Sequence, residues 1–212
     1  MQKNTVLKSR LVKAALCVAV AFSASASHAT PILLQNAGFE TNSQGQSYQY
    51  LDGQTVDGWS FVGNAGVAGN NSLFNVANAP GNQAAFLQQA GASISQAFTF
   101  AGGMLSVDFL AQYRFYYGGN TVQVSINDQL LTFNGATSFS PSSDNTFTQY
   151  QTDAIALAAG DYVLKFTGTD GLHDYTTFID NVSVNAVPEP GSLALLGAGL
   201  LAVAGLRRRR RG

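Results

Sequence analysis

The chain has 212 residues, a formal charge of −1, and only 11% charged residues. The near-neutral total hides an uneven distribution, because residues 30–187 hold two basic and eleven acidic side chains, a formal charge of −9. A region with this charge is not expected to bind DNA, RNA or anionic lipid, and it contains no cysteine that could form a disulfide.

The first 29 residues have the pattern of a secretory signal peptide. Lys3, Lys8, Arg10 and Lys13 precede an apolar run over residues 14–22, and Ser27-His28-Ala29 follows as a small-x-small site. The apolar run is too short to span a bilayer comfortably. We therefore predict passage through the Sec translocon and cleavage after Ala29.

Residues 30–186 are predicted to form one all-β domain. Apolar and polar side chains alternate through most of this region, which is typical of antiparallel strands. The apolar faces are Ile94, Phe98 and Phe100; Leu105, Val107, Phe109, Ala111 and Tyr113; Val122, Val124 and Ile126; and Tyr162, Leu164 and Phe166. Asn127-Asp128 has the composition of a tight hairpin turn. Many short strands with frequent turns favour a β-sandwich of the jelly-roll type.

One stretch of this domain leaves a second secondary structure open. Residues 154–159, AIALAA, could form a short helix, because they lack a clear alternation. Strand-like sequences flank the stretch on both sides, so a strand is the competing prediction.

The last 26 residues predict temporary insertion into the inner membrane. Pro188-Glu189-Pro190 is followed by an uncharged segment at residues 191–206 and by Arg207–Arg211. At about 1.5 Å per residue, a helix over this segment is roughly 24 Å long, somewhat short for a hydrocarbon core of about 30 Å. The arginines are expected to stay in the cytoplasm, so residues 30–186 are exported.

This order of parts resembles the PEP-CTERM sorting signal, which combines a Pro-Glu-Pro box, an apolar helix and an arginine-rich end. The resemblance covers residues 187–212 and implies processing by an exosortase near Pro188, Glu189 and Pro190. It also implies release to the cell surface or extracellular matrix of a Gram-negative bacterium that makes exopolysaccharide.

Three short stretches of the domain resemble galactose-binding-like and carbohydrate-binding jelly rolls. They are LLQNAGFET at 33–41, DGW at 57–59 and FIDNVSV at 178–184. The resemblance implies that the first and last strands pair. It also implies a structural calcium between an early glutamate and a late aspartate.

The residues themselves give a partly independent reason to expect calcium. In FIDNVSV, Asp180 shares the parity of Phe178, Val182 and Val184, so a regular strand would point its carboxylate inward. A buried carboxylate needs a partner or a proton. Calcium held by Asp180, Glu40 and backbone carbonyls, with help from Asn36, would supply one. Alternatively, a bulge turns Asp180 outward, or N–H groups of a turn satisfy it.

No catalytic set stands out in the exported region. His173 is its one histidine and has no nucleophile beside it, and neither GxSxG nor HExxH occurs. We therefore predict that the protein is not an enzyme. An extracellular glycoside hydrolase is the less favoured alternative, because it would require two of the eleven acids to converge about 5–10 Å apart.

Aromatic side chains are the best candidates for binding a ligand, because sugar rings stack on them. Tyr48 and Tyr50 are one such group, and Arg114, Tyr116 and Tyr117 before a Gly-Gly loop are another. Trp59 is a further candidate, although a tryptophan this size could equally fill the core. Arg114 could instead pair with a buried acid.

These features predict a secreted, non-catalytic surface or matrix protein that associates with exopolysaccharide. The alternative is a self-associating structural or adhesive matrix component without a sugar site. Exposed Tyr116 and Tyr117 would favour the first hypothesis, and buried ones the second.

Overall fold

The computed structural model describes residues 30–41, 43–170 and 174–187, together with helical positions 197 and 199. The predictions for the signal peptide with Ala29, for His173, for Pro188, Glu189 and Pro190, and for Arg207–Arg211 lie outside the described residues. So does the predicted apolar helix, except for those two positions. Within the described part, no helix is long and apolar enough to cross a membrane.

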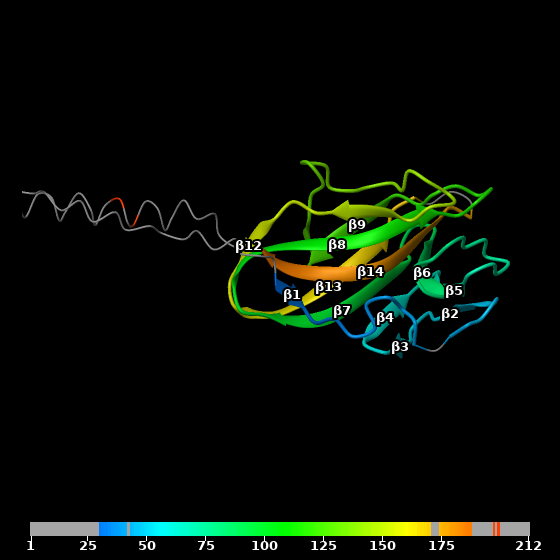
Figure 1. Ribbon diagram of the computed structural model, residues 1–212, viewed down its shortest axis with the longest axis horizontal. Coiled ribbons are helices and arrows are strands. Elements are labelled where there is room, and N and C mark those ends of the chain that lie inside the picture. Colours follow the sequence, from blue (N-terminus) through cyan, green and yellow to red (C-terminus); the bar gives the residue numbers. More distant parts are fainter. Residues whose placement is uncertain (1–29, 42, 171–173, 188–196, 198, 200–212) are drawn as a thin grey trace, which may run out of the picture.

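The described chain forms a sandwich of two antiparallel sheets (Figure 1). Sheet A has the strand order β11-β8-β14-β6-β5-β2, with β1 also pairing with β14 and β12 with β8. Its strands are β1 Thr30–Ile32, β2 Tyr48–Tyr50, β5 Ala65–Gly69, β6 Gln83–Gln88, β8 Gly103–Tyr113, β11 Thr148–Gln151, β12 Ile155–Leu157 and β14 Thr176–Val187.

Sheet B faces sheet A and has the order β10-β9-β13-β7-β4-β3. Its strands are β3 Thr55–Val56, β4 Trp59–Val62, β7 Ser93–Phe100, β9 Val122–Ile126, β10 Gln129–Leu130 and β13 Gly160–Gly168. The prediction of an all-β jelly-roll sandwich is confirmed.

The core between the sheets contains the apolar faces that the alternation predicted. Buried members include Leu105, Val107, Phe109 and Ala111 of β8; Val122, Val124 and Ile126 of β9; and Leu164 and Phe166 of β13. Removing these side chains from water is the main driving force for closing the sandwich. The period of two was sufficient to find them because one face of each strand is buried.

Two local predictions can be compared directly with the structure. Residues 155–157 form strand β12 and pair with Gly103–Leu105 of β8, so the helical alternative for AIALAA is wrong. Pairing with an available edge overrides the helix propensity of the alanines. The hairpin at Asn127-Asp128 is confirmed, since both residues have positive φ, 47° and 64°, as a type I′ turn requires.

A second, smaller core covers part of the outer face of sheet A, the face away from sheet B. Residues 70–82 lie across this face and pack Phe74, Val76 and Ala79 against Phe86 and Phe178. The outer face of sheet A is therefore partly buried, and some of its polar side chains, such as Gln112 and Asp180, are shielded from water.

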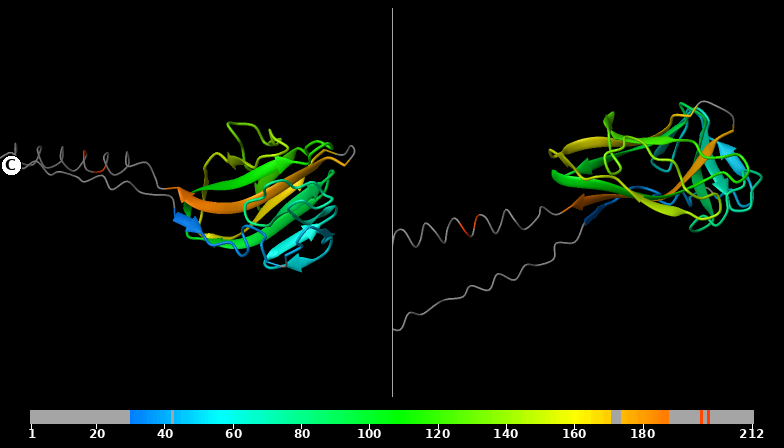
Figure 2. Two further views of the ribbon diagram at one scale, coloured as in Figure 1. Left: turned by 45° about the vertical axis from the view of Figure 1, so that its right-hand side comes forward. Right: turned by 90° about the horizontal axis from the view of Figure 1, so that it is seen from above.

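The two ends of the domain lie side by side. Thr30 pairs with Ala186, so the first and last strands are neighbours, as the resemblance implied (Figures 1 and 2). The twelve residues of β14 span about 40 Å. Because β8 runs antiparallel to β14, the turn after Tyr113 lies at the opposite end from Val187.

Candidate functional site

A β-bulge in β14 determines where Asp180 points. Asp180 pairs with Leu110, whereas Ser183 pairs with Asp108, so β14 advances three residues while β8 advances two. Ile179 and Val182 therefore both face the core between the sheets, and Asp180 lies on the outer face of sheet A. The prediction that Asp180 points into the core with Val182 and Val184 is therefore wrong, and the alternative that a bulge turns it to the other face of the sheet is confirmed.

Asp180 is nevertheless fully buried. Its Oδ1 accepts a hydrogen bond from the N–H of Asn181 at 2.6 Å, but its Oδ2 has no hydrogen-bond partner in the described part of the chain. Burial raises the pKa of Asp180 to about 8; the Asn181 N–H opposes this rise and the nearby charge of Glu40 adds to it. Without a cation, this carboxyl group is protonated at neutral pH.

Glu40 is held beside Asp180 by a tight turn. Asn36 and Phe39 both have positive φ, and the N–H of Phe39 donates to the Asn36 carbonyl at 2.9 Å. The Glu40 carboxylate accepts bonds from the N–H and side-chain amide of Asn82, at 2.8 and 3.1 Å, and from the N–H of Gln83 at 3.2 Å. These bonds fix its orientation.

The turn is also tied to the last strand and to the core. The N–H of Val182 donates to the Ala37 carbonyl at 3.0 Å, directly after the bulge. Trp59 Nε1 donates to the carbonyls of Gln35 and Asn36, both at 3.1 Å. The buried indole therefore positions the segment that carries Glu40.

The donor atoms around Gly38 are compatible with a calcium ion. A Cβ at Gly38 would lie 3.1 Å from Asn181 Oδ1, 3.6 Å from Asp180 Oδ1 and 3.9 Å from Glu40 Cγ. Oxygens of Asn181 and Asp180 therefore lie near this point, whereas Glu40 approaches it with its Cγ and directs its carboxylate toward Asn82 and Gln83. Asp180 Oδ2 has no partner in the described part of the chain. Among the described residues, no group of three or more His, Cys, Asp or Glu could hold a metal, so carbonyl and amide oxygens would have to complete the shell.

Asn181, and not the predicted Asn36, has a side-chain oxygen that faces the candidate calcium site. The Asn36 side-chain oxygen already accepts the N–H of Thr41 at 3.1 Å, and its carbonyl accepts the Trp59 and Phe39 donors. Asn181 Oδ1, which was not singled out from the sequence, faces Gly38 instead. Only the bulge and the positive φ of Asn181, 45°, bring it there.

Glycine is required next to Glu40 at position 81, where φ is +85° and a Cβ would collide with Glu40 Oε1. We expect Gly81→Ala to cost more stability than the roughly 1–2 kcal/mol of a left-handed non-glycine residue. Gly53→Ala is the matched control, because Gly53 has a similar φ of +70° with no atom within 4 Å of the added Cβ. Urea unfolding measures both, and equal losses would show that the Glu40 contact does not matter.

Three exposed tyrosines lie around two buried side chains and form one cluster, which we call the aromatic patch: Tyr48, Tyr50 and Tyr117 with Phe74 and Arg114. The rings of Tyr48 and Tyr50 lie 4.8 and 5.9 Å from Phe74, and the Arg114 guanidinium lies 4.3 Å from Phe74 and 3.9 Å from Tyr117. Tyr48, Tyr50 and Tyr117 are 38%, 40% and 44% exposed. Phe74, from the segment over sheet A, is the link that could not be inferred from local sequence.

The other aromatic candidates have different positions. Tyr116 is 85% exposed and contacts Phe115 at the tip of the turn after β8. Trp59 is fully buried, with its ring centroid 4.9 Å from that of Phe39, so it belongs to the core and does not contact a ligand.

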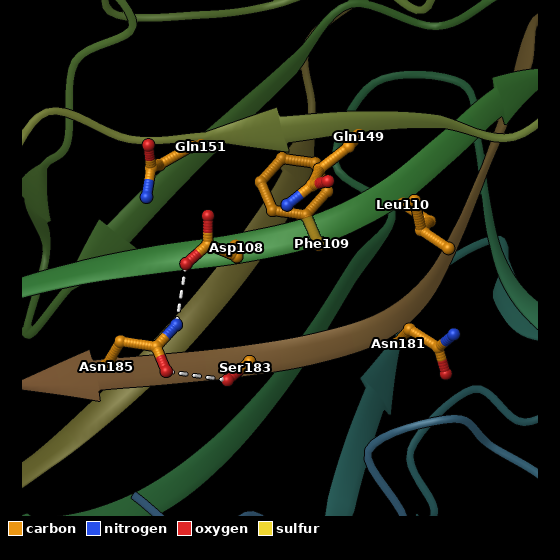
Figure 3. Close-up of a pocket in the computed structure, with 8 residues that line it drawn as sticks. All are labelled: Asp108, Phe109, Leu110, Gln149, Gln151, Asn181, Ser183 and Asn185. Carbon is orange, nitrogen blue, oxygen red and sulfur yellow. Dashed lines mark hydrogen bonds between the residues drawn. The ribbon is translucent and has the colours of Figure 1, made fainter. Parts of the chain in front are cut away.

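A polar pocket of about 500 Å³ lies on the same outer face, over β11, β8 and β14 (Figure 3). Asn185 donates to Asp108 Oδ2 at 2.6 Å, and Ser183 donates to Asn185 Oδ1 at 3.0 Å. Gln149 and Gln151 line the opposite side. Asp108 is the one carboxylate among the lining residues, so this pocket lacks the pair of acids that glycoside hydrolysis uses.

The end of the chain matches the family model of the PEP-CTERM protein-sorting motif over residues 186–210. This match confirms the resemblance seen around Pro188, Glu189 and Pro190. It marks the chain for export and for exosortase-dependent delivery to the surface or the exterior of a Gram-negative cell.

Solved structures share the fold of the domain. Fisc, a Stig cyclase from Fischerella sp. TAU crystallised with an indole ligand, has a TM-score of 0.55 and 18% identity, covering 77% of this chain and all of its own. TmCBM61 with β-1,4-galactotriose has a TM-score of 0.47 and 17% identity, covering 73% and 98%. Carbohydrate-binding module CBM36 with calcium and xylotriose has a TM-score of 0.42 and 17% identity, covering 56% and 87%.

These neighbours include carbohydrate-binding modules and cyclases, and at such identities the likeness to Fisc shows the fold alone. No curated protein sequence matches the chain.

Proposed function

We propose that this protein is a non-catalytic component of the cell surface or extracellular matrix that binds exopolysaccharide through the aromatic patch. The observation that carries the proposal is a set of half-exposed tyrosine rings: Tyr48 and Tyr50 lie against Phe74, and Tyr117 lies against Arg114, which also contacts Phe74. Tyrosine presents an apolar ring to a sugar face and a hydroxyl to its polar edge. Tyr116 and Tyr117 are both exposed, but only Tyr117 belongs to the patch, so its exposure is the one that favours this function over a purely structural one.

The position of the patch fits a tethered protein. Arg114 and Tyr117 follow β8 at the end of the domain opposite to Val187, where the sorting motif begins. Before exosortase releases the domain, the patch therefore points away from the end that leads to the membrane. The polar pocket on the same face offers amide and hydroxyl groups to further sugar hydroxyls.

The proposed role of calcium is structural. Bound by Glu40, Asp180 and the Asn181 side chain, the ion would join the turn after β1 to the last strand. It would also neutralise two carboxylates in a region whose formal charge is −9. Nothing in this role requires the ion to contact the polysaccharide.

The test uses residues 30–187, which contain both sheets and both cores. Affinity electrophoresis through gels containing xylan, galactan, dextran or polygalacturonate should show retardation by at least one polymer. Replacing Tyr48 and Tyr50 with alanine should weaken this binding by roughly tenfold or more, the usual cost of removing a central tyrosine contact. Tyr116→Ala, outside the patch, should change it much less.

If none of the polysaccharides retarded the domain, this result would argue against the proposal, particularly if sedimentation showed that the domain associates with itself. An unchanged affinity in the double variant would move binding to another surface, such as the polar pocket. Cooperative thermal unfolding of each variant controls for misfolding.

A further inference from the structure

Arg114 is a buried basic residue that forms no ion pair in the described part of the chain. Only 8% of the residue is exposed, and within residues 30–41, 43–170 and 174–187 its guanidinium makes no hydrogen bond or ion pair. The ion pair found in that part of the chain joins Lys165 to Asp128 at 4.0 Å, on sheet B. A partly buried guanidinium that forms no ion pair can gain from an anionic ligand, because a charge-assisted hydrogen bond is stronger where water is partly excluded.

Two aromatic rings pack against the guanidinium. The central carbon lies over the ring of Phe74 at 4.3 Å and over that of Tyr117 at 3.9 Å. Nε is the only guanidinium nitrogen that is both fully buried and unpartnered, so the two Nη groups still reach solvent. The free N–H groups of a guanidinium lie in its plane, which is the arrangement that binds a carboxylate with two parallel hydrogen bonds.

The backbone holds Arg114 firmly in this position. Its N–H donates to the Thr176 carbonyl at 3.0 Å, and its own carbonyl accepts from Tyr117 and Gly118 at 3.2 and 3.1 Å. The guanidinium is thus positioned before any ligand arrives, which reduces the entropy lost on binding.

The outer face of sheet A next to Arg114 carries further polar groups without a hydrogen-bond partner in the described structure. Gln112 lies two residues earlier on the same face of β8 and is fully buried, yet neither its amide nitrogen nor its amide oxygen has a partner in the described structure. Buried amides without partners are rare in folded proteins. This part of the outer face therefore has more hydrogen-bonding capacity than the described chain uses.

We propose that Arg114 binds the carboxylate of a sugar acid, so that the polysaccharide held by the aromatic patch contains uronic acid. This inference rests on the proposed function and names its ligand class. In this arrangement, Tyr48, Tyr50 and Tyr117 stack on the faces of neighbouring sugar rings, and the Arg114 guanidinium donates hydrogen bonds to a carboxylate between them. The charge of −9 repels polyanions in general, so selectivity for the acid comes from this local contact.

The test compares short acidic oligosaccharides with their own neutral counterparts. Trimers of galacturonate, glucuronate and mannuronate, each with its carboxyl-reduced form, are titrated calorimetrically into residues 30–187. At least one acid should bind tenfold or more tightly than its reduced counterpart. Arg114→Gln should abolish that preference, and Arg114→Lys should lose most of it, because an ammonium group cannot form the paired bonds.

Lys165→Gln is the matched control, because Lys165 is the only other basic residue in residues 30–187. It removes the same charge and should leave the preference intact. Arg114→Met, which keeps most of the packing between the two rings, guards against a loss caused by unfolding and should behave like Arg114→Gln.

The outcomes separate the two proposals. If neutral sugars bind as tightly as their acids, or if Arg114→Gln keeps the preference, the inference fails while polysaccharide binding stands. If no oligosaccharide and no polymer of the larger panel binds, both fail. If Lys165→Gln also lost the preference for the acidic oligosaccharide, the overall charge of the domain, and not Arg114, would account for that preference.

Discussion

Replacing Asp180 with asparagine is expected to stabilise the calcium-free domain at neutral pH and to flatten the pH dependence of its stability. The pKa of Asp180 is raised to about 8 by burial, compared with 3.8 for the free group. Between these values the folded domain keeps a proton that the unfolded chain releases. The free energy of unfolding therefore falls as pH rises from about 4 to about 8, and it levels off above 8.

The size of the effect follows from the two pKa values. A rise from 3.8 to about 8 corresponds to roughly 6 kcal/mol across the whole window, and asparagine, which does not ionise, removes this pH dependence. Urea unfolding at pH 5, 7 and 9 in the presence of chelator measures the change. A wild-type domain that is as stable at pH 9 as at pH 5 would contradict the assignment.

Calcium should narrow the difference in stability between the wild type and the Asp180→Asn variant. A cation favours the ionised carboxylate, so calcium should raise the melting temperature of the wild type more at pH 8.5 than at pH 5.5. At a hundredfold excess over its dissociation constant, the ion adds about 2.7 kcal/mol. Asp180→Asn should lose most of this response. If calcium has no effect on the wild type at either pH, the metal proposal falls, while the pH prediction for the chelated domain remains.

Truncating Trp59 to alanine should destabilise the domain by about 3–5 kcal/mol, the usual cost of removing a large buried aromatic side chain. The ring is fully buried against Phe39, and its Nε1 donates to two carbonyls of the segment that leads to Glu40. Two acceptors thus lose their donor along with the packing. Urea unfolding in calcium and in chelator measures the loss.

Two further variants separate packing from hydrogen bonding. Trp59→Phe keeps much of the apolar volume but not the N–H, so it should cost about 1–3 kcal/mol. It should also weaken the calcium response, because the Asn36 turn is then less firmly held. Tyr116→Ala removes an exposed ring and should be nearly neutral. A Trp59→Ala loss below 1 kcal/mol would be incompatible with the burial of this ring.

The sorting signal and the strands were predictable because both are encoded locally. The Pro-Glu-Pro box, the apolar segment and the arginines are contiguous and were read directly from the order of residues. The strands follow from alternation, which needs only neighbours two residues apart, so Leu105, Val107 and Phe109 were assigned to the core correctly. Residues 155–157 were ambiguous because their strand depends on pairing with distant Gly103–Leu105.

The candidate site was only partly predictable, because it depends on interruptions of that regularity. The bulge after Asp180 places Val182 and Asp180 on opposite faces of sheet A, and nothing in FIDNVSV marks the extra residue. Glu40 and Asp180 were named as a pair and lie close together, but the contribution of Asn181 depends on its positive φ. Trp59 had two possible roles until its burial showed that it is part of the core.

The sequence by itself determined the export and sorting of this protein, its all-β class and most of the core between its sheets. These properties depend on contiguous segments and on the alternation of apolar and polar residues, and both can be recognised from residues that are close together in the sequence. Only the tertiary structure decided that Tyr48, Phe74, Arg114 and Tyr117 share one patch, because they come from three separate segments. It likewise decided that Arg114 is buried and forms no ion pair with the described residues, since burial and charge pairing depend on long-range contacts.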